Sequence, residues 1–209
     1  MGLYAKHILP RFIDLAMRNK DTARLRAEWI PKARGTVLEI GIGSGLNLPF
    51  YSPDVDRVYG LDPSAELQAM ARDRAVDTSR QVQFLTQSAE QPIPLAPGSI
   101  QTVVMTWTLC SIPNPSMAFE EVKRLLRSDG GLIFLEHGRA PESKVAAWQD
   151  RLTPLWKRIG GGCHLNRRID SIIQDAGFKI RELRTGYLPG PRPMTYTYEG
   201  FAQRVRDMA

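Results

Sequence analysis

The sequence predicts an α/β domain in which a mostly parallel β-sheet is covered by helices on both faces. From Gly35 onward, short apolar runs of strand length alternate with longer stretches of helical periodicity. This alternation is typical of strand–helix–strand units, whose crossover helices cover both faces of a parallel sheet. A glycine-rich turn, Gly41-Ile-Gly-Ser-Gly45, directly follows the first apolar run. In open α/β sheets, such a turn marks a ligand site at the carboxyl ends of the strands.

The first 34 residues predict two amphipathic helices. Apolar residues recur at helical spacing from Leu3 to Met17, and Pro10 is expected to break this helix. A second helix is expected from Asp21 or Thr22 to Ile30, since a proline follows there.

The strands and helices of the core follow in order from apolar patterning and capping residues. We expect strands over residues 36–40, 57–61, 82–85, 100–106 and 131–136, and a closing antiparallel pair over 178–185 and 194–204. Helices are expected over residues 64–76, 115–126, 144–159 and 167–176, the first of them capped by Ser64. The pattern shows no linker, so residues 1–209 are expected to form one domain, with helices in 1–34 and the core in 35–209.

Composition excludes several classes of protein. With 209 residues, 43% hydrophobic and 24% charged, the chain has ordinary globular values and is neither disordered nor collagen-like. No apolar run approaches the ~18–20 residues that cross a bilayer, and no secretory signal is recognised. Two cysteines, Cys110 and Cys163, are too few for a disulfide framework, which favours a reducing cytoplasm.

The net charge of +6 is unevenly distributed along the chain. It divides into +5 over residues 1–34, −5 over 35–143 and +6 over 144–192. Nucleic-acid binders concentrate basic residues on the recognition element, whereas here basic segments flank an acidic centre. We therefore expect no nucleic-acid partner, and expect the basic segments to form a lid or rim over the ligand site.

The glycine-rich turn favours a ligand with a cationic end. A nicotinamide site would need a glycine at position 46, where this sequence has Leu46. Glu39 stands two residues before Gly41, and a carboxylate there would repel a pyrophosphate but attract a cation. These residues point to S-adenosylmethionine.

Three further elements follow successive predicted strands. Asp62 ends the second strand, where a carboxylate accepts hydrogen bonds from ribose hydroxyls. Gln87-Ser-Ala-Glu90 follows the third strand and Met105-Thr-Trp-Thr-Leu109 the fourth, beside the adenine and the reacting centre. The alternative is that the glycines only form a tight turn and Asp62 only caps a helix.

The segment Leu38-Glu-Ile-Gly-Ile-Gly-Ser-Gly45 resembles motif I of class I S-adenosylmethionine-dependent methyltransferases of the type 11 family. The resemblance covers about residues 35–137 and implies a Rossmann-like, seven-stranded sheet in the order 3-2-1-4-5-7-6, with strand seven antiparallel. The cofactor contacts that it implies are carried by Glu39, Gly41, Gly43, Gly45, Asn47, Asp62, Pro63, Ser64, Ser88, Ala89, Glu90, Thr106 and Trp107.

Three other segments look like those of the methyltransferase-like 7 (thiol methyltransferase 1) group. They are Leu109-Cys-Ser111, Phe134-Leu-Glu-His137 and Gly162-Cys-His-Leu-Asn-Arg167. Members of that group are membrane-associated alkyl-thiol methyltransferases with a hydrophobic N-terminal anchor, from which the amphipathic N-terminus of this chain departs. The substrate side that this resemblance implies consists of Leu109, His137, Cys163, His164 and Arg167.

His137 and His164 are the candidate catalytic residues. His137 follows the fifth strand at the ligand-bearing edge, where it could act as a base, orient the substrate or bond a backbone carbonyl. His164 lies in a glycine-rich run that either closes over the site or only connects two helices. Side chains of neighbours such as Cys163 and His164 diverge, so no metal site is predicted.

The function that these residues favour is methyl transfer from S-adenosylmethionine to a small, fairly hydrophobic acceptor, with a thiol preferred. Alternatives are N-methylation of an amine or phospholipid headgroup, a non-catalytic cofactor-binding module and, more distantly, a NAD oxidoreductase. The expected partner is a small-molecule acceptor. The location is expected to be cytoplasmic, and the basic amphipathic N-terminus allows weak peripheral membrane contact.

Overall fold

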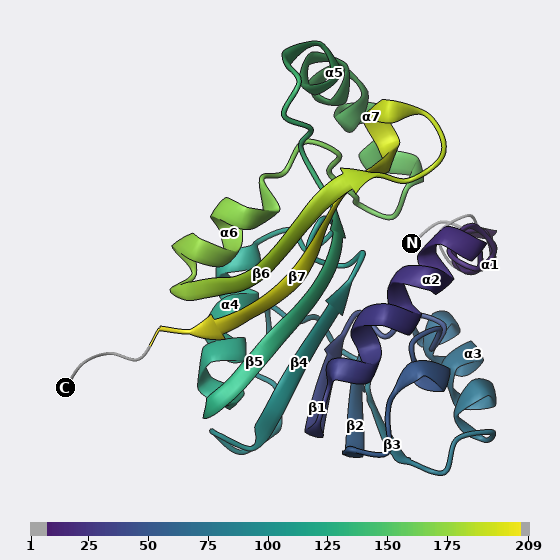
Figure 1. Ribbon diagram of the computed structural model, residues 1–209. Coiled ribbons are helices and arrows are strands. Elements are labelled where there is room, and N and C mark those ends of the chain that lie inside the picture. Colours follow the sequence, from purple (N-terminus) through teal and green to yellow (C-terminus); the bar gives the residue numbers. More distant parts are fainter. Residues whose placement is uncertain (1–7, 206–209) are drawn as a thin grey trace.

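The computed structural model describes residues 8–205 and contains a seven-stranded sheet in the order β3-β2-β1-β4-β5-β7-β6 (Figure 1). The strands are β1 Gly35–Ile40, β2 Val55–Leu61, β3 Gln81–Leu85, β4 Ile100–Thr106, β5 Leu126–His137, β6 Phe178–Tyr187 and β7 Tyr196–Arg204. Neighbouring strands are parallel except that β7 is antiparallel to both β5 and β6. The predicted strand order and the antiparallel seventh strand are confirmed.

Seven α-helices and two short 3₁₀ segments are described. The α-helices are α1 Leu9–Ala16, α2 Lys20–Trp29, α3 Ala65–Ala75, α4 Pro115–Leu125, α5 Ser143–Ile159, α6 Ile169–Asp175 and α7 Arg192–Thr195. The 3₁₀ segments are η2 Ile30–Lys32 and η3 Leu48–Phe50. In Figure 1, α4 and α6 lie on one side of the sheet, and α5 and α7 lie beyond the carboxyl end of β4.

Both faces of the sheet are buried. Successive residues of a strand point to opposite faces, so neighbouring residues pack into different apolar clusters. Leu38 belongs to a cluster packed against α4 and α6, whereas its neighbour Val37 belongs to a second cluster with α2. Val103 and Val104 divide between the two clusters in the same way. Both faces of the central strands are therefore apolar, as the continuous apolar runs in the sequence indicate.

The helix ends follow local sequence signals, with one correction to the prediction. The Asn19 side chain caps α2 by accepting from the backbone N–H of Thr22, and the Ser64 hydroxyl caps α3 through Leu67. Pro10 does not break the first helix but lies in the first turn of α1, where its missing N–H would have no helical partner. The part of this predicted helix that precedes residue 8 lies outside the described residues.

Two differences occur in the second half of the chain. Strand β5 begins at Leu126, directly after α4, where pairing of Leu126 with Ile100 extends it beyond the predicted 131–136. The short helix α7 was not predicted. It occupies part of the proline-rich connection, with Pro191 as its N-cap residue, so that β7 begins at Tyr196.

Candidate functional site

A cavity of about 830 Å³ lies at the carboxyl ends of β1, β2 and β4. Its wall is formed by the glycine-rich turn, by the segments that follow β2 and β4, and by one face of α1. The volume is within the range of roughly 300–1,000 Å³ that small-molecule sites occupy. The position is the one expected for a ligand site in an open α/β sheet.

The glycine-rich turn is held against β2 by backbone bonds. The N–H groups of Gly41 and Ile42 donate to the carbonyl of Leu61, at 2.7 and 3.1 Å. A Cβ at Gly41 would overlap the side chain of Thr108, whereas one at Gly43 would approach only the carbonyl of Gly41, at 3.9 Å. Gly41 is therefore required for packing, and Gly43 leaves open space where a ligand can approach the backbone.

Glu39 lies at the buried centre of a polar network. Its carboxylate accepts hydrogen bonds from Asn47 Nδ2 at 2.8 Å and from the hydroxyl of Tyr51 at 2.7 Å. Burial raises the pKa of Glu39 to about 7, although both hydrogen bonds and the charge of Arg26 oppose that rise. The Arg26 side chain, itself buried, donates to Asn47 Oδ1 at 3.0 Å. The side-chain amide of Asn47 therefore bridges the Arg26 guanidinium and the Glu39 carboxyl.

Asp62 joins the glycine-rich turn to the start of α3. One oxygen accepts from the backbone N–H of Gly43 at 3.0 Å, and the other from that of Ser64 at 2.8 Å. Burial raises the pKa of Asp62, while these two backbone bonds favour its ionised form. Asp62 thus lies in the cavity wall and orders the residue before α3, whereas the helix cap itself is Ser64.

Trp107, directly after β4, combines two unusual features. It is the one non-glycine residue with positive φ, 52°, among the described residues, and its backbone N–H donates to the carbonyl of Leu135 at 2.6 Å. Its indole Nε1 is buried and has no hydrogen-bond partner within the described part of the chain. A strained backbone and an unsatisfied donor in a cavity wall are typical of a ligand site.

Most of the predicted cofactor residues line the cavity together. They are Glu39, Gly41, Gly43, Asn47, Asp62, Pro63, Ser64, Ser88, Ala89, Thr106 and Trp107. Gly45 and Glu90 lie outside the lining. A Cβ at Gly45 would meet Ala71 and Leu48, and the Glu90 carboxylate accepts from the Ser88 hydroxyl and from the backbone N–H of Asn114.

The predicted substrate-side residues lie next to this wall rather than in its lining. Leu109 and Cys163 are buried, and His137 contacts the Trp107 ring edge to face at a centroid distance of 6.4 Å. Burial lowers the pKa of His164, and Arg167 nearby lowers it further. Such a histidine is neutral at physiological pH, but its Nδ1 lies 3.1 Å from the carbonyl of Cys110 instead of in the cavity.

The turn after β4 is fixed from both sides. The buried carboxylate of Glu136 accepts from the N–H groups of Thr108, Leu109 and Cys110, at 2.9, 2.9 and 3.1 Å. Arg167 donates to the carbonyls of Leu109 and Ile112, at 2.6 and 2.7 Å. Arg167 therefore positions the segment that carries part of the cavity wall, in addition to any contact with substrate.

Several wall residues were missed in the sequence. Helix α1 and its C-cap residue contribute Leu9, Ile13 and Met17, spaced four residues apart, and Arg26 of α2 and Gly161 after α5 also reach the lining. The four-residue spacing indicates an apolar helix face, but nothing local in the sequence says which surface that face covers.

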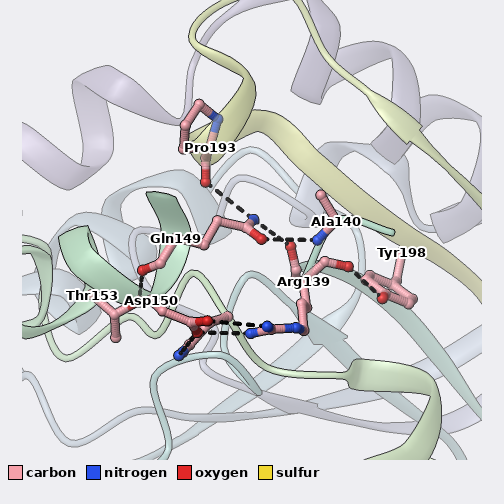
Figure 2. A network of polar contacts seen from close by, with 9 residues as sticks. Arg139, Ala140, Gln149, Asp150, Thr153, Pro193 and Tyr198 are labelled. Atoms are coloured by element: carbon pink, nitrogen blue, oxygen red, sulfur yellow. Dashed lines mark hydrogen bonds and ion pairs between the residues drawn. The ribbon is translucent and has the colours of Figure 1, made fainter. Parts of the chain in front are cut away.

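A polar network fixes α5 beyond the end of β5 (Figure 2). The buried Gln149 accepts from the N–H of Ala140 at 2.9 Å and donates to the carbonyls of Gly138 and Pro193, at 2.9 and 3.2 Å. Arg139 pairs with both carboxylate oxygens of Asp150, at 2.7 and 3.0 Å. These contacts hold the residues that follow His137 in one place.

The family follows from comparison with known proteins. A model described as a methyltransferase domain matches residues 38–134. The thiol S-methyltransferase TMT1A of Homo sapiens is 32% identical over 180 residues, covering 80% of this chain and 71% of that protein. This chain belongs to the S-adenosylmethionine-dependent methyltransferases.

Two further relatives agree with that membership. Thiol S-methyltransferase TMT1B is 36% identical in Rattus norvegicus and 38% in Homo sapiens, covering 75% and 68% of this methyltransferase. The chain spans 64% and 59% of the lengths of these two relatives.

Solved structures share the fold. A methyltransferase from Aquifex aeolicus has a TM-score of 0.63 at 19% identity, covering 94% of this chain and 98% of that one. One from Methanosarcina mazei has a TM-score of 0.65 at 22% identity, covering 82% of this chain and 93% of that one.

Within residues 8–205, no helix of this chain combines the length and apolarity needed to cross a membrane.

The cavity fits S-adenosylmethionine. Glu39 and Asp62 would supply carboxylates for a cationic group and for ribose hydroxyls, and the open space at Gly43 would admit a ligand against the backbone. The unsatisfied Nε1 of Trp107 supplies a donor. These residues would hold the cofactor, whose sulfonium offers a methyl group to a nucleophile in an in-line displacement.

Proposed function

We propose that this methyltransferase methylates the sulfur of a small, fairly apolar thiol. The observation that carries the proposal is its similarity to proteins named thiol S-methyltransferase, at 32–38% identity over 148–180 residues. A small, apolar acceptor agrees with the aliphatic side chains that α1 and the turn after β4 contribute to the cavity, such as Leu9, Ile13 and Ile112.

The polar groups of the cavity also suit a thiol. Four lining carboxylates already accept hydrogen bonds within the protein: Asp14 from Arg18 and Arg74, Glu39 from Asn47 and Tyr51, Asp62 from two backbone N–H groups, and Glu66 from the Ser64 hydroxyl. No histidine or lysine belongs to the lining described here. A thiol, with an ordinary pKa near ~8.5, needs little help to lose its proton, and a nearby cation such as Arg26 favours the thiolate.

A panel of acceptors tests the proposal. The purified chain is incubated with radiolabelled S-adenosylmethionine and with alkyl thiols, matched alkyl amines and matched alcohols of the same chain length. We expect methylation of the thiols alone. Transfer to the amines or alcohols with none to the thiols would reject the thiol assignment.

Asp62→Asn provides the negative control for this experiment. The substitution removes a charge that accepts two backbone hydrogen bonds, each worth about 1.5–3 kcal/mol when a charged group takes part. Calorimetry should show cofactor affinity reduced at least about tenfold, since ~1.4 kcal/mol corresponds to that factor. Thiol methylation should fall in parallel.

A second candidate is N-methylation of a phospholipid headgroup. The phosphatidylethanolamine N-methyltransferase of Cereibacter sphaeroides is 29% identical and covers 75% of this chain. Helix α1 and the residues that flank it expose Ile8, Phe12 and Leu15 together with Arg11 and Arg18, a surface suited to an anionic interface.

Vesicles separate the two candidates. Phosphatidylethanolamine vesicles should not be methylated if the thiol proposal holds. Co-sedimentation with anionic vesicles that is unchanged after removal of residues 1–30 would remove the structural motive for the second candidate.

The free Cys110 and Cys163 support a proposed cytoplasmic location.

A further inference from the structure

Three side chains from separate segments meet beside the cavity wall. Cys110 lies in the turn after β4, His137 ends β5, and Cys163 lies in the loop after α5. The two sulfur atoms are 3.4 Å apart, and the donor atoms of all three residues lie within 4.8 Å of one another. Neither cysteine is bonded in a disulfide.

The turn that carries Cys110 is held rigidly. Its N–H groups are bound by Glu136 and two of its carbonyls by Arg167, and the carbonyl of Cys110 accepts from the backbone N–H of His164 at 2.8 Å. The last bond also fixes the neighbouring Cys163. The sulfur atoms are therefore placed by the backbone, which is the way proteins preorganise ligands of a metal ion.

The loop that carries Cys163 needs glycines to reach this position. Gly161 and Gly162 have φ values of 65° and 87°, which other residues rarely adopt, and a Cβ at Gly162 would press on the carbonyl of Ser111. The backbone N–H of Cys163 then donates to the carbonyl of Gly160 at 3.3 Å. These glycines turn Cys163 inward, toward Cys110.

The surroundings of the two sulfurs exclude water. Leu165 belongs to the same buried cluster as the cysteines, and Leu152, Trp156 and Met194 pack against that cluster. His137, by contrast, is half-buried and contacts Trp107, a residue of the cavity wall. An apolar shell strengthens charge-based contacts between sulfur and a cation.

The geometry suits a tetrahedral metal ion better than a disulfide. With bonds of about 2.3 Å to sulfur and about 2.0 Å to nitrogen, ligand atoms around zinc lie roughly 3.5–3.8 Å apart. The two sulfurs, 3.4 Å apart, are close to that separation, and the imidazole nitrogen, within 4.8 Å of both, would move closer on binding. A disulfide would instead need its sulfurs at about 2.05 Å.

We propose that Cys110, His137 and Cys163 bind a divalent transition-metal ion that prefers sulfur and nitrogen ligands, with zinc as the first choice. Each thiol releases its proton to solvent on binding, so two thiolates balance the charge of the ion, and neutral imidazole is the third ligand. The tetrahedron keeps a fourth position for water or another ligand. The metal partner of Cys163 is thus His137, distant in sequence, and not the adjacent His164.

Metal analysis of the full chain tests the proposal. The chain is purified without a histidine tag, under reducing conditions and without chelators, and its metal content is measured by mass spectrometry. We expect about one zinc ion per chain. After exchange for cobalt, we expect sulfur-to-cobalt charge-transfer absorption in the near ultraviolet and visible bands of tetrahedral cobalt.

Variants assign the ligands. Cys163→Ser and His137→Gln should each lose most of the metal and the cobalt–sulfur absorption. His164→Gln is the matched control, since its ring contacts the backbone carbonyl of Cys110 and supplies no ligand atom to the cluster, and it should keep both. Metal retained in all three variants would overturn the proposal.

A measurement on the unaltered chain covers the case in which variants fail to fold. In a urea concentration that opens the chain transiently, reaction of the two thiols with a disulfide reagent should be slower with zinc present than after a strong chelator is added. A reduced chain that binds neither zinc nor cobalt would overturn the proposal. So would a mass lower by two hydrogens, which would show that the cysteines form a disulfide instead.

Discussion

At the scale of single residues, Glu39 is the group whose charge depends most on its surroundings. Its pKa is raised by burial to about 7, against an ordinary value of 4.5. Between these two values the folded chain retains a proton that the unfolded chain has lost, so the free energy of unfolding falls as the pH rises. The slope from this group is at most about 1.4 kcal/mol per pH unit.

Glu39→Gln should remove this slope, because an amide does not titrate. We expect urea unfolding to show wild type losing stability relative to the variant between pH 5 and pH 7.5. Comparing the difference between the two proteins cancels the titration of other groups. An identical difference at both pH values would show that Glu39 does not change its ionisation on folding.

Replacing Gly41 of the ligand turn by alanine is predicted to cost more stability than replacing another glycine that has positive φ. Gly41→Ala places a methyl group into Thr108 and imposes positive φ, 75°, on alanine. Gly98, with φ 62° and no atom within 4 Å of an added Cβ, provides the control. Gly98→Ala should cost about 1–2 kcal/mol of backbone strain.

Gly41→Ala should cost a further ~1–3 kcal/mol from overpacking and should also weaken cofactor binding. Thermal unfolding with and without cofactor measures both effects. Equal losses of stability in the two variants would mean that Thr108 moves aside freely.

At the scale of elements, the attachment of α5 depends on one buried amide. Gln149→Leu leaves the N–H of Ala140 and the carbonyls of Gly138 and Pro193 without their partner. Because each unsatisfied buried group costs about 1–3 kcal/mol, we expect a loss of at least ~2 kcal/mol in urea unfolding.

The matched control lies in the same network (Figure 2). Arg139→Gln breaks the ion pair between Arg139 and Asp150. Their side chains are 33% and 45% exposed, respectively. A pair screened to this degree contributes only about 0.2–1 kcal/mol. A larger loss for Arg139→Gln than for Gln149→Leu would contradict the importance assigned to the amide.

Elements with a local signal were predictable from sequence, and those fixed by distant contacts were not. Strands β1 to β4 and the residues at their ends follow from short apolar runs and from a turn within one stretch of chain, with bounds within about two residues. Pro10 was misjudged because a proline breaks the interior of a helix but is tolerated in its first turn. Helix α7 has only four residues and therefore no periodicity to read.

The same distinction applies to the site. Glu39 and Asp62 stand at strand ends and could be placed from topology alone. The cover that α1 provides, and the meeting of Cys110 with Cys163 across 53 positions, depend on tertiary packing that leaves no local pattern. The basic segments predicted at the rim contribute Arg26 to the lining, but its guanidinium is buried beside Glu39 rather than exposed.

At the scale of the whole molecule, α1 closes one side of the cavity and is tied to α3 by a buried carboxylate. Asp14 pairs with Arg74 of α3 at 2.9 Å and with Arg18 at 2.5 Å, and Arg74 also donates to the carbonyl of Ser44 in the glycine-rich turn. The lining from α1 therefore depends on this junction.

Asp14→Ala should loosen α1 with little effect on the rest of the fold. Loss of charged hydrogen bonds worth about 1.5 kcal/mol or more predicts cofactor dissociation roughly tenfold faster in stopped-flow fluorescence. Arg11→Ala, at an exposed position on the same helix, should behave as wild type. Unchanged dissociation in Asp14→Ala would show that α1 does not retain the cofactor.

The position of β7 between β5 and β6 has a consequence for biosynthesis. Strand β6 pairs only with β7 among the described strands, and β7 ends at Arg204. While the ribosome is still translating residues 178–195, β6 therefore has no hydrogen-bonded neighbour, and β5 presents an open edge. The five parallel strands β1 to β5 can assemble during translation, but the sheet is completed only after the last strand has left the exit tunnel.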